Sequence, residues 1–312
     1  MFNVLDFHPP TGLASPHLQM VFSNLTPTGD EPPSKSLLIS LNDGDKLSCE
    51  VSTPPEWQPH QATIVMVHGL GGSHLSPYMI RLSRKFYQEG RRVVRTNLRG
   101  CGSGSGLNEL PYNSGNSHDV WTILETLKTE TPSSPINVIG FSLGGNIIIK
   151  MAGEQGENAS KFLNRVIAVC PVLNLAESVN QLSQRSNWFY HKYYLKKIHE
   201  QGEKWIQKQS ISSVFEFDEK ITAPLWGYAN ANDYYEKCSS CNFLSNIQVP
   251  CDLLLTADDP FIDHSILEQT KISASTKVWL TEHGGHMGFI AWTGEKQGFF
   301  WMDKLLLDWN LT

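Results

Sequence analysis

The sequence predicts an α/β protein with a mostly parallel central sheet flanked by helices. Two observations support this class. Short apolar, β-branched runs alternate with longer runs whose apolar residues have helical spacing, which is the pattern of βαβ units. Several predicted strands are apolar without interruption, as strands are when helices cover both faces of a parallel sheet. The 312 residues are 40% hydrophobic and 18% charged, and we expect a single domain over 1–312.

The first half of the chain is predicted from signals at strand and helix ends. Asn42-Asp43-Gly44-Asp45 is a strong β-hairpin turn, and Ser76-Pro77 supplies an N-cap and a proline at the first helical position. Residues 1–36 are rich in Pro, Ser and Thr, and we expect them to form an extended arm. The predicted strands are 37–41, 46–51, 62–67, 92–96 and 137–139, and the predicted helices are 77–89, 118–130 and 146–152.

The second half continues this alternation after one long interruption. Residues 174–222 carry aromatic and basic side chains at helical spacing, and the stretch is too long for a loop between adjacent elements. We expect a helical cap over the ends of the strands. Its aromatic side chains either line a pocket for an apolar group or pack the cap on the core. The remaining predicted elements are strands at 165–169, 251–256 and 277–280 and an amphipathic helix at 299–309.

The middle of the chain contains Gly140-Phe141-Ser142-Leu143-Gly144 between a predicted strand and a predicted helix. Gly-x-Ser-x-Gly at such a junction is typical of a nucleophile elbow, a turn so sharp that the serine backbone is strained. Side chains in place of Gly140 or Gly144 would collide with the flanking strand and helix. The turn lifts the Ser142 hydroxyl above the sheet, next to a helix N-terminus that favours developing negative charge.

An elbow requires an acid and then a histidine, each after a later strand. Asp258 and Asp259 follow one of the last two predicted strands, and His283 and His286 follow the other. The order Ser, Asp, His is that of an α/β-hydrolase, in which the histidine takes the serine proton and the carboxylate fixes the imidazole. Adjacent residues in extended backbone point to opposite faces, so only one of the two aspartates can reach the histidine. Asp263 is a third acid, at a position typical of a helix N-cap.

A second glycine-rich loop, residues 68–72, follows an earlier strand. It lacks the Lys-Ser/Thr pair that completes a phosphate-binding P-loop, because Ser73-His74 stands there. In the elbow architecture this loop supplies the first backbone donor of the oxyanion hole. We expect the N–H groups of Leu70 and Leu143 to form the hole, where each donor contributes roughly 3–4 kcal/mol. The glycine-rich residues 97–106 are either a functional loop over the site or a surface connection.

The composition of the chain indicates which binding partners and which cellular compartment to expect. A formal charge of −6 without a basic stripe argues against nucleic-acid binding. Cys238 and Cys241 have CxxC spacing, but no second pair follows, so we predict reduced thiols, no metal site and an intracellular protein. The chain shows no signal peptide, and no apolar run approaches the ~20 residues of a membrane-spanning helix. We expect a cytoplasmic protein without a transmembrane segment and without a cofactor.

Blocks of sequence spread along most of the chain match those of one known family. They are His17-Leu18-Gln19, His68-Gly69-Leu70, Leu98-Arg99-Gly100-Cys101, Gly140 to Asn146, Phe217-Asp218, Tyr234-Tyr235, Asp258-Asp259-Pro260-Phe261 and His283 to Phe289. With these blocks the chain resembles the YheT-like esterases of the α/β-hydrolase superfamily. The resemblance implies a serine hydrolase acting on carboxylic esters, with Ser142 as nucleophile, Asp259 as acid and His286 as base. Membrane-bound relatives usually carry an apolar N-terminal anchor, which this sequence lacks, so we do not expect their lipid substrates.

The predicted function is therefore a carboxylesterase that cleaves a small-molecule ester through an acyl-enzyme. The cap and the missing anchor favour short or medium acyl chains over long ones. Two alternatives stay open: an acyltransferase that uses the same triad with an alcohol acceptor, and a non-catalytic binding protein on a hydrolase scaffold. The intact triad argues against the second alternative. The sequence makes no prediction of the oligomeric state.

Overall fold

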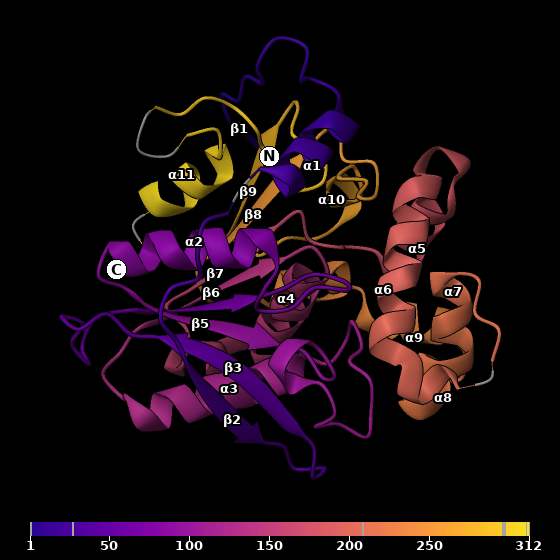
Figure 1. Cartoon of the computed structure of the whole chain (residues 1–312), viewed down its shortest axis with the longest axis horizontal. Coiled ribbons are helices and arrows are strands. Elements are labelled where there is room, and N and C mark those ends of the chain that lie inside the picture. The colour runs from indigo at the N-terminus through magenta and orange to yellow at the C-terminus, as the bar shows by residue number, and fades with distance from the viewer. Residues whose placement is uncertain (1, 27, 208, 295–297, 310, 312) are drawn as a thin grey trace.

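The computed structural model describes residues 2–26, 28–207, 209–294, 298–309 and 311. Over these residues the chain forms a nine-stranded sheet in the order β1-β9-β8-β7-β6-β4-β5-β3-β2 (Figure 1). The strands are β1 (Asn3–Val4), β2 (Lys35–Ser40), β3 (Lys46–Ser52), β4 (Thr63–Val67), β5 (Arg92–Asn97), β6 (Ile136–Phe141), β7 (Arg165–Val169), β8 (Cys251–Thr256) and β9 (Thr276–Thr281).

In the spatial order just given, the strands from β1 at one edge across to β5 run parallel. The β2–β3 hairpin adds two antiparallel strands beyond β5, at the other edge. The predicted α/β class with a mostly parallel sheet is thus confirmed. The predicted strands begin and end within two residues of the observed ones. The hairpin turn also lies where the sequence predicts it, with Gly44 in the left-handed region at φ 93°.

Helices cover both faces of the sheet, as the uninterrupted apolar strands require. In β4, Val65 and Val67 belong to the core that α3 and α4 cover, whereas Ile64 and Met66 belong to the core beneath α2 and α11. The helices are α1 (Pro16–Leu25), α2 (Pro77–Gln88), α3 (Ser117–Glu130), α4 (Leu143–Gln155), α5 (Leu175–Ser183), α6 (Trp188–Ile206), α7 (Val214–Phe217), α8 (Ala223–Leu225), α9 (Ala231–Cys238), α10 (Ile266–Gln269) and α11 (Trp301–Asp308).

Helix α4 begins earlier than predicted, at Leu143 instead of residue 146. Gly144 and Gly145 lie in its first turn, and glycine has low helix propensity, so the sequence alone places the start too late. Packing of these two glycines against neighbouring backbone offsets that low propensity. The helix therefore starts directly after Ser142, and its N-terminus faces the serine.

The N-terminal residues differ from the extended arm that the sequence predicts. Strand β1 adds a parallel strand beside β9, and α1 forms ten residues of helix. Pro16 occupies the first turn, where proline is tolerated because its missing N–H has no helical partner. Gln19, Met20 and Ser23 are buried on one face of α1, so packing against the body of the protein stabilises a helix that local propensity does not predict.

The stretch from Leu175 to Cys238 contains helices α5 to α9, which group together on one side of the molecule beside the sheet (Figure 1). The predicted cap, residues 174–222, covers α5, α6 and α7, and its residue 208 lies outside the described residues. Between α7 and α8 the backbone forms a π-helix at Asp218–Thr222. Helix α5 contacts both α6 and α9, so the group packs as one layer. Within the described ranges, every helix is too short or too polar to cross a lipid bilayer.

Candidate active site

Ser142 sits on the sharp turn between β6 and α4 that the sequence predicts. Its backbone has φ 53° and ψ −114°, a strained conformation for a residue with a side chain. A Cβ on Gly140 would lie 2.4 Å from the Gly144 carbonyl oxygen, and one on Gly144 would lie 2.3 Å from the Val67 carbonyl oxygen. Both glycines are therefore required for the close approach of β6, α4 and β4 that creates the elbow.

Ser142 is joined to two later residues by a chain of hydrogen bonds. His286 Nε2 lies 2.8 Å from Ser142 Oγ, and His286 Nδ1 lies 2.7 Å from Asp259 Oδ2. The side chains of His286 and Asp259 are only 5% and 1% exposed. With Nδ1 protonated and hydrogen-bonded to the carboxylate, Nε2 is free to accept the hydroxyl proton of the serine.

The backbone just after Asp259 holds its carboxylate in place. Oδ1 accepts hydrogen bonds from the N–H groups of Phe261, at 2.8 Å, and Ile262, at 3.1 Å. Oδ2 is thereby turned toward His286. The Phe261 ring also packs edge-on against the imidazole, with 5.1 Å between ring centroids. The turn after β8 thus orients both the carboxylate and the imidazole.

The other candidate acids and the other candidate base have partners outside the chain of hydrogen bonds from Ser142 to Asp259. Asp258 Oδ1 accepts a hydrogen bond from the Gly285 N–H, and Asp258 Oδ2 lies 3.6 Å from His283 Nδ1. Asp258 therefore supports the loop that carries His286, 27 residues away in sequence. Asp263 Oδ1 accepts from the Ser265 N–H in the turn before α10, and Ser265 is the N-cap residue of that helix, so the predicted N-cap position was wrong.

The two predicted oxyanion donors flank Ser142. Leu70 and Leu143 both line the pocket at the serine, and neither N–H has a hydrogen-bond acceptor within the described part of the chain. The Leu70 loop is fixed by Tyr78, whose hydroxyl accepts from the Gly69 N–H at 2.9 Å. His68 is fully buried; its Nε2 accepts from a backbone N–H, and burial lowers its pKa to about 4, so it is neutral at pH 7.

A largely apolar pocket opens at Ser142 and runs beneath the cap. It holds about 960 Å³ of space that no atom fills, part of it open to solvent. Tyr194 lines this pocket, whereas the neighbouring aromatics Trp188, Phe189 and Tyr193 are more than half exposed. Only some of the cap's aromatic side chains therefore line the pocket. The aliphatic and aromatic lining from the cap comprises Leu175, Val179, Leu182, Tyr194, Ile198, Trp205, Val214, Phe217, Tyr234 and Tyr235.

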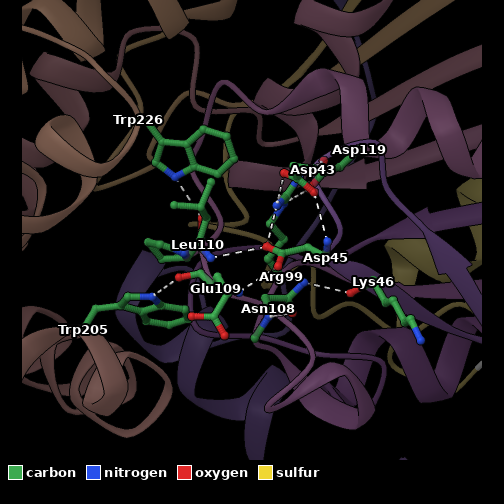
Figure 2. A network of polar contacts seen from close by, with 12 residues as sticks. Asp43, Asp45, Lys46, Arg99, Asn108, Glu109, Leu110, Asp119, Trp205 and Trp226 are labelled. Atoms are coloured by element: carbon green, nitrogen blue, oxygen red, sulfur yellow. Dashed lines mark hydrogen bonds and ion pairs between the residues drawn. The ribbon is translucent and has the colours of Figure 1, made fainter.

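Arg99 is the hub of a polar network beside this pocket (Figure 2). Its guanidinium contacts Asp43 and Asp45 of the β2–β3 hairpin at 2.6 and 2.7 Å. On its other side it forms a two-point pair with Asp119 of α3, at 2.7 and 2.8 Å. The side chain of Arg99 is 4% exposed. The glycine-rich segment after β5 is thus anchored at its start.

The segment beyond Arg99 is held from the cap by two tryptophans (Figure 2). Trp205 of α6 donates its indole N–H to the Glu109 carbonyl at 2.6 Å, and Trp226 donates to the Pro111 carbonyl at 2.9 Å. The backbone after β5 therefore lies between the Arg99 network and the cap. Arg99 lines the pocket from within the glycine-rich residues 97–106, and Pro111 lines it from the chain that follows them, so this backbone lies beside the site.

Sequence reasoning missed a buried polar cluster in the cap. Asp218 lines the pocket and accepts hydrogen bonds from Thr222 and Tyr235, each at 2.8 Å. Burial raises the pKa of Asp218 to about 6 although both hydroxyl donors oppose that shift. The sequence block Phe217-Asp218 marked the position, but no local pattern indicated its partners, which lie on the π-helix and on α9.

Cys170 is buried beside two residues of the candidate site. Its Sγ, the Asp259 carboxylate and the His286 ring fall within 4.8 Å of one another. These are donor types that bind transition metals. However, Asp259 and His286 already share a hydrogen bond, which a metal bound at those atoms would break. Burial, together with the neighbouring Asp259 charge, raises the pKa of the Cys170 thiol well above its usual value.

Comparison with known proteins places this geometry in context. A family model described as "alpha/beta hydrolase fold" matches residues 62–291. The "Putative esterase YheT" of Escherichia coli is 28% identical over 98% of this chain and 93% of its own length. The human "Phospholipase ABHD3" is 26% identical over 86% of this chain and 67% of its own. Among solved structures, a 2,6-dihydroxy-pseudo-oxynicotine hydrolase covers 95% of this chain, over 71% of its own length, with a TM-score of 0.60 at 17% identity.

Proposed function

The chain belongs to the alpha/beta hydrolase fold family, as its motifs predict, and from this premise we propose that it is a serine hydrolase that cleaves carboxylic esters. Its relatives include esterases and lipases. The observation that carries the proposal is the continuous hydrogen-bond chain from Ser142 through His286 to Asp259 at the mouth of an apolar pocket. We propose Ser142 as the nucleophile, His286 as the base and Asp259 as the acid.

The reaction proceeds in two halves. Ser142 Oγ forms a bond to the ester carbonyl carbon while its proton passes to His286 Nε2, and Asp259 stabilises the resulting imidazolium. The carbonyl oxygen gains a negative charge, which the Leu70 and Leu143 N–H groups stabilise. The bond to the alcohol then breaks, and the alcohol leaves with the proton from His286. In the second half a water molecule, deprotonated by His286, attacks the acyl-enzyme and releases the carboxylic acid.

The charges of the pocket favour uncharged esters with an apolar acyl group. Arg99 lines the pocket, but its guanidinium is already bonded to three carboxylates. It therefore offers little attraction to an anionic substrate. Asp218 also lines the pocket, and with a pKa of about 6 its carboxylate is mostly ionised at pH 7, so it would repel an anionic group of the substrate. We infer that the substrate is a neutral ester of short or medium acyl length.

The proposal is tested with a fluorophosphonate probe and a p-nitrophenyl butyrate assay. Wild type should be labelled and should turn over the ester. Ser142→Ala should lose labelling and roughly 10⁴–10⁶-fold in kcat while its melting temperature stays close to that of wild type. Ser178→Ala is the matched control, because Ser178 lines the same pocket on the cap and should leave both signals nearly unchanged.

Activity of Ser142→Ala near the wild-type level would refute a serine nucleophile. Failure of the wild-type protein to react with any probe or ester would favour a binding protein on this scaffold. Product analysis with added alcohol separates hydrolysis from acyl transfer. Free carboxylic acid as the main product supports the esterase, and a new ester as the main product supports the acyltransferase.

A further inference from the structure

The segment His17-Leu18-Gln19 stood out in the sequence, yet no step of the proposed reaction uses it. In the structure it belongs to α1, whose ribbon is drawn close to those of β9 and α10 in the view of Figure 1. This end of α1 contacts the loop Gly284–Ile290 that carries His286. An element some 270 residues away in sequence thus touches the loop of the proposed base.

Gln19 makes this contact through its side-chain amide. Its Oε1 accepts the Ile290 N–H at 2.5 Å, and its Nε2 donates to the Ile290 carbonyl at 3.1 Å and to the Leu13 carbonyl at 2.8 Å. Gln19 is 0% exposed. One side chain therefore satisfies both backbone polar groups of Ile290, four residues after His286, much as a neighbouring strand would.

The loop and the helix also meet backbone to backbone. A Cβ on Gly285 would lie 2.5 Å from the Pro16 carbonyl oxygen, and a Cβ on Gly288 would lie 2.7 Å from the Gln19 side chain. Both approaches are closer than real Cβ atoms tolerate. The two glycines on either side of His286 are thus required for α1 to pack as closely as it does.

The loop itself has backbone conformations that need outside support. Met287 and Phe289 have φ of 64° and 45°, in the left-handed region that side chains disfavour. Such residues cost on the order of 1–3 kcal/mol each, and they persist where the surroundings hold them. The hydrogen bonds of Gln19 to Ile290 hold the far end of this strained stretch, and Asp258 holds its near end through the Gly285 N–H.

We propose that Gln19 is a positioning residue for the proposed base. By fixing the backbone of Ile290, it holds the strained loop so that His286 Nε2 stays within hydrogen-bond reach of Ser142 Oγ. The expected loss of activity rests on the proposed function. The expected loosening of the loop rests on the contacts of Gln19 alone. Gln19 touches neither Ser142 nor His286, so it acts through the loop.

The test replaces Gln19 with methionine, which has nearly the same shape and no amide. Gln19→Met should lower kcat for p-nitrophenyl butyrate on the order of 10²-fold, the loss expected when a catalytic group moves by about 1 Å. KM should stay within about threefold of wild type, because the pocket is unchanged. Active sites are titrated with the fluorophosphonate, and the assay temperature lies well below the melting temperature of each variant.

Met20→Ala is the control for a simple loss of stability. Met20 is the next residue on α1 and is 6% exposed, but it belongs to the larger of the two apolar cores, whereas Phe289 of the loop belongs to the other. Its truncation should lower the free energy of unfolding by about 2–5 kcal/mol and leave kcat per active site near wild type. An equal loss of kcat in Met20→Ala, or a wild-type kcat in Gln19→Met, overturns the proposal.

Amide hydrogen exchange supplies a readout that does not depend on ester cleavage. Peptides that cover residues 284–290 should exchange faster in Gln19→Met than in wild type, and Met20→Ala should show no comparable local increase. If wild type cleaves no ester, the proposed function fails, but this comparison still decides whether Gln19 holds the loop. Unchanged exchange in Gln19→Met overturns the positioning role in either case.

Discussion

At the scale of single residues, the structure separates two adjacent carboxylates. Asp259 receives His286 and two backbone N–H groups, whereas Asp258 receives the Gly285 N–H. The two side chains have different partners although they follow β8 in a turn and not in an extended strand, so the turn after β8 sets their directions. One of them is placed to act on the imidazole, and the other to support the loop around it.

This difference predicts distinct effects for the two aspartate variants. Asp259→Asn should lower kcat by up to about 10⁴-fold, because an amide no longer stabilises the imidazolium or fixes its tautomer. Asp258→Asn should lower kcat less than about tenfold, since its amide oxygen can still accept the Gly285 N–H. Measuring kcat and melting temperature for both variants checks the assignment, and a catalytically dead Asp258→Asn beside an active Asp259→Asn would reverse it.

At the scale of elements, the cap forms a large part of the pocket that would hold the acyl group of the proposed ester substrate. Helices α5, α6 and α7 contribute one aliphatic wall of the pocket, and the body of the protein contributes the other with Leu70, Leu143, Val172 and Ile262. Each methylene that moves from water into this wall contributes about 0.8 kcal/mol. The ratio kcat/KM should therefore rise with acyl chain length only until the pocket is full, because the further carbons of a longer chain must extend into solvent.

This limit predicts an optimum in chain length across p-nitrophenyl esters from two to sixteen carbons. The ratio kcat/KM should rise to a short or medium acyl chain and then fall. Val179→Trp fills the pocket from α5, and should lower kcat/KM for octanoate roughly 10²-fold relative to acetate, the equivalent of about four buried methylenes. Phe189→Trp, at an exposed cap position, is the control. A steady rise in kcat/KM out to sixteen carbons in wild type would contradict the pocket limit.

At the scale of the whole molecule, the Arg99 network joins elements that are distant in sequence. It brings together the β2–β3 hairpin, the segment after β5 and α3, and the same segment continues to the cap tryptophans (Figure 2). Asp45 and Asp119 are buried, so they depend on the guanidinium to compensate their charge. Loss of Arg99 would leave this charge uncompensated across three parts of the fold.

Arg99→Met should therefore lower the free energy of unfolding by about 3–5 kcal/mol, the usual cost of removing one partner of a buried ion pair. Lys196→Met is the control: its pair with Glu200 spans 3.8 Å on the surface of α6 and should change stability by less than about 1 kcal/mol. Urea unfolding of both variants measures the difference. Equal stability of Arg99→Met and wild type would show that the network contributes nothing net.

The sequence by itself determined the features that depend on neighbours along the chain. The elbow at Ser142 follows from steric limits at Gly140 and Gly144, and the strand ends follow from runs of apolar residues. The succession of strands along the chain, and the order serine, acid, histidine along it, follow from these local signals. Each of these signals spans only a few residues, so a local pattern is enough to predict it.

Only the tertiary structure decided which of these residues meet. The contact of Asp259 with His286, the clamp of Gln19 on Ile290 and the helix at Pro16–Leu25 all depend on segments far apart in sequence. The spacing of apolar and polar residues indicates which face of a helix or strand is buried. It carries no information on which other element covers that face. Partner choice depends on the packing of the whole chain, because burial and hydrogen bonding are satisfied between elements and not within them.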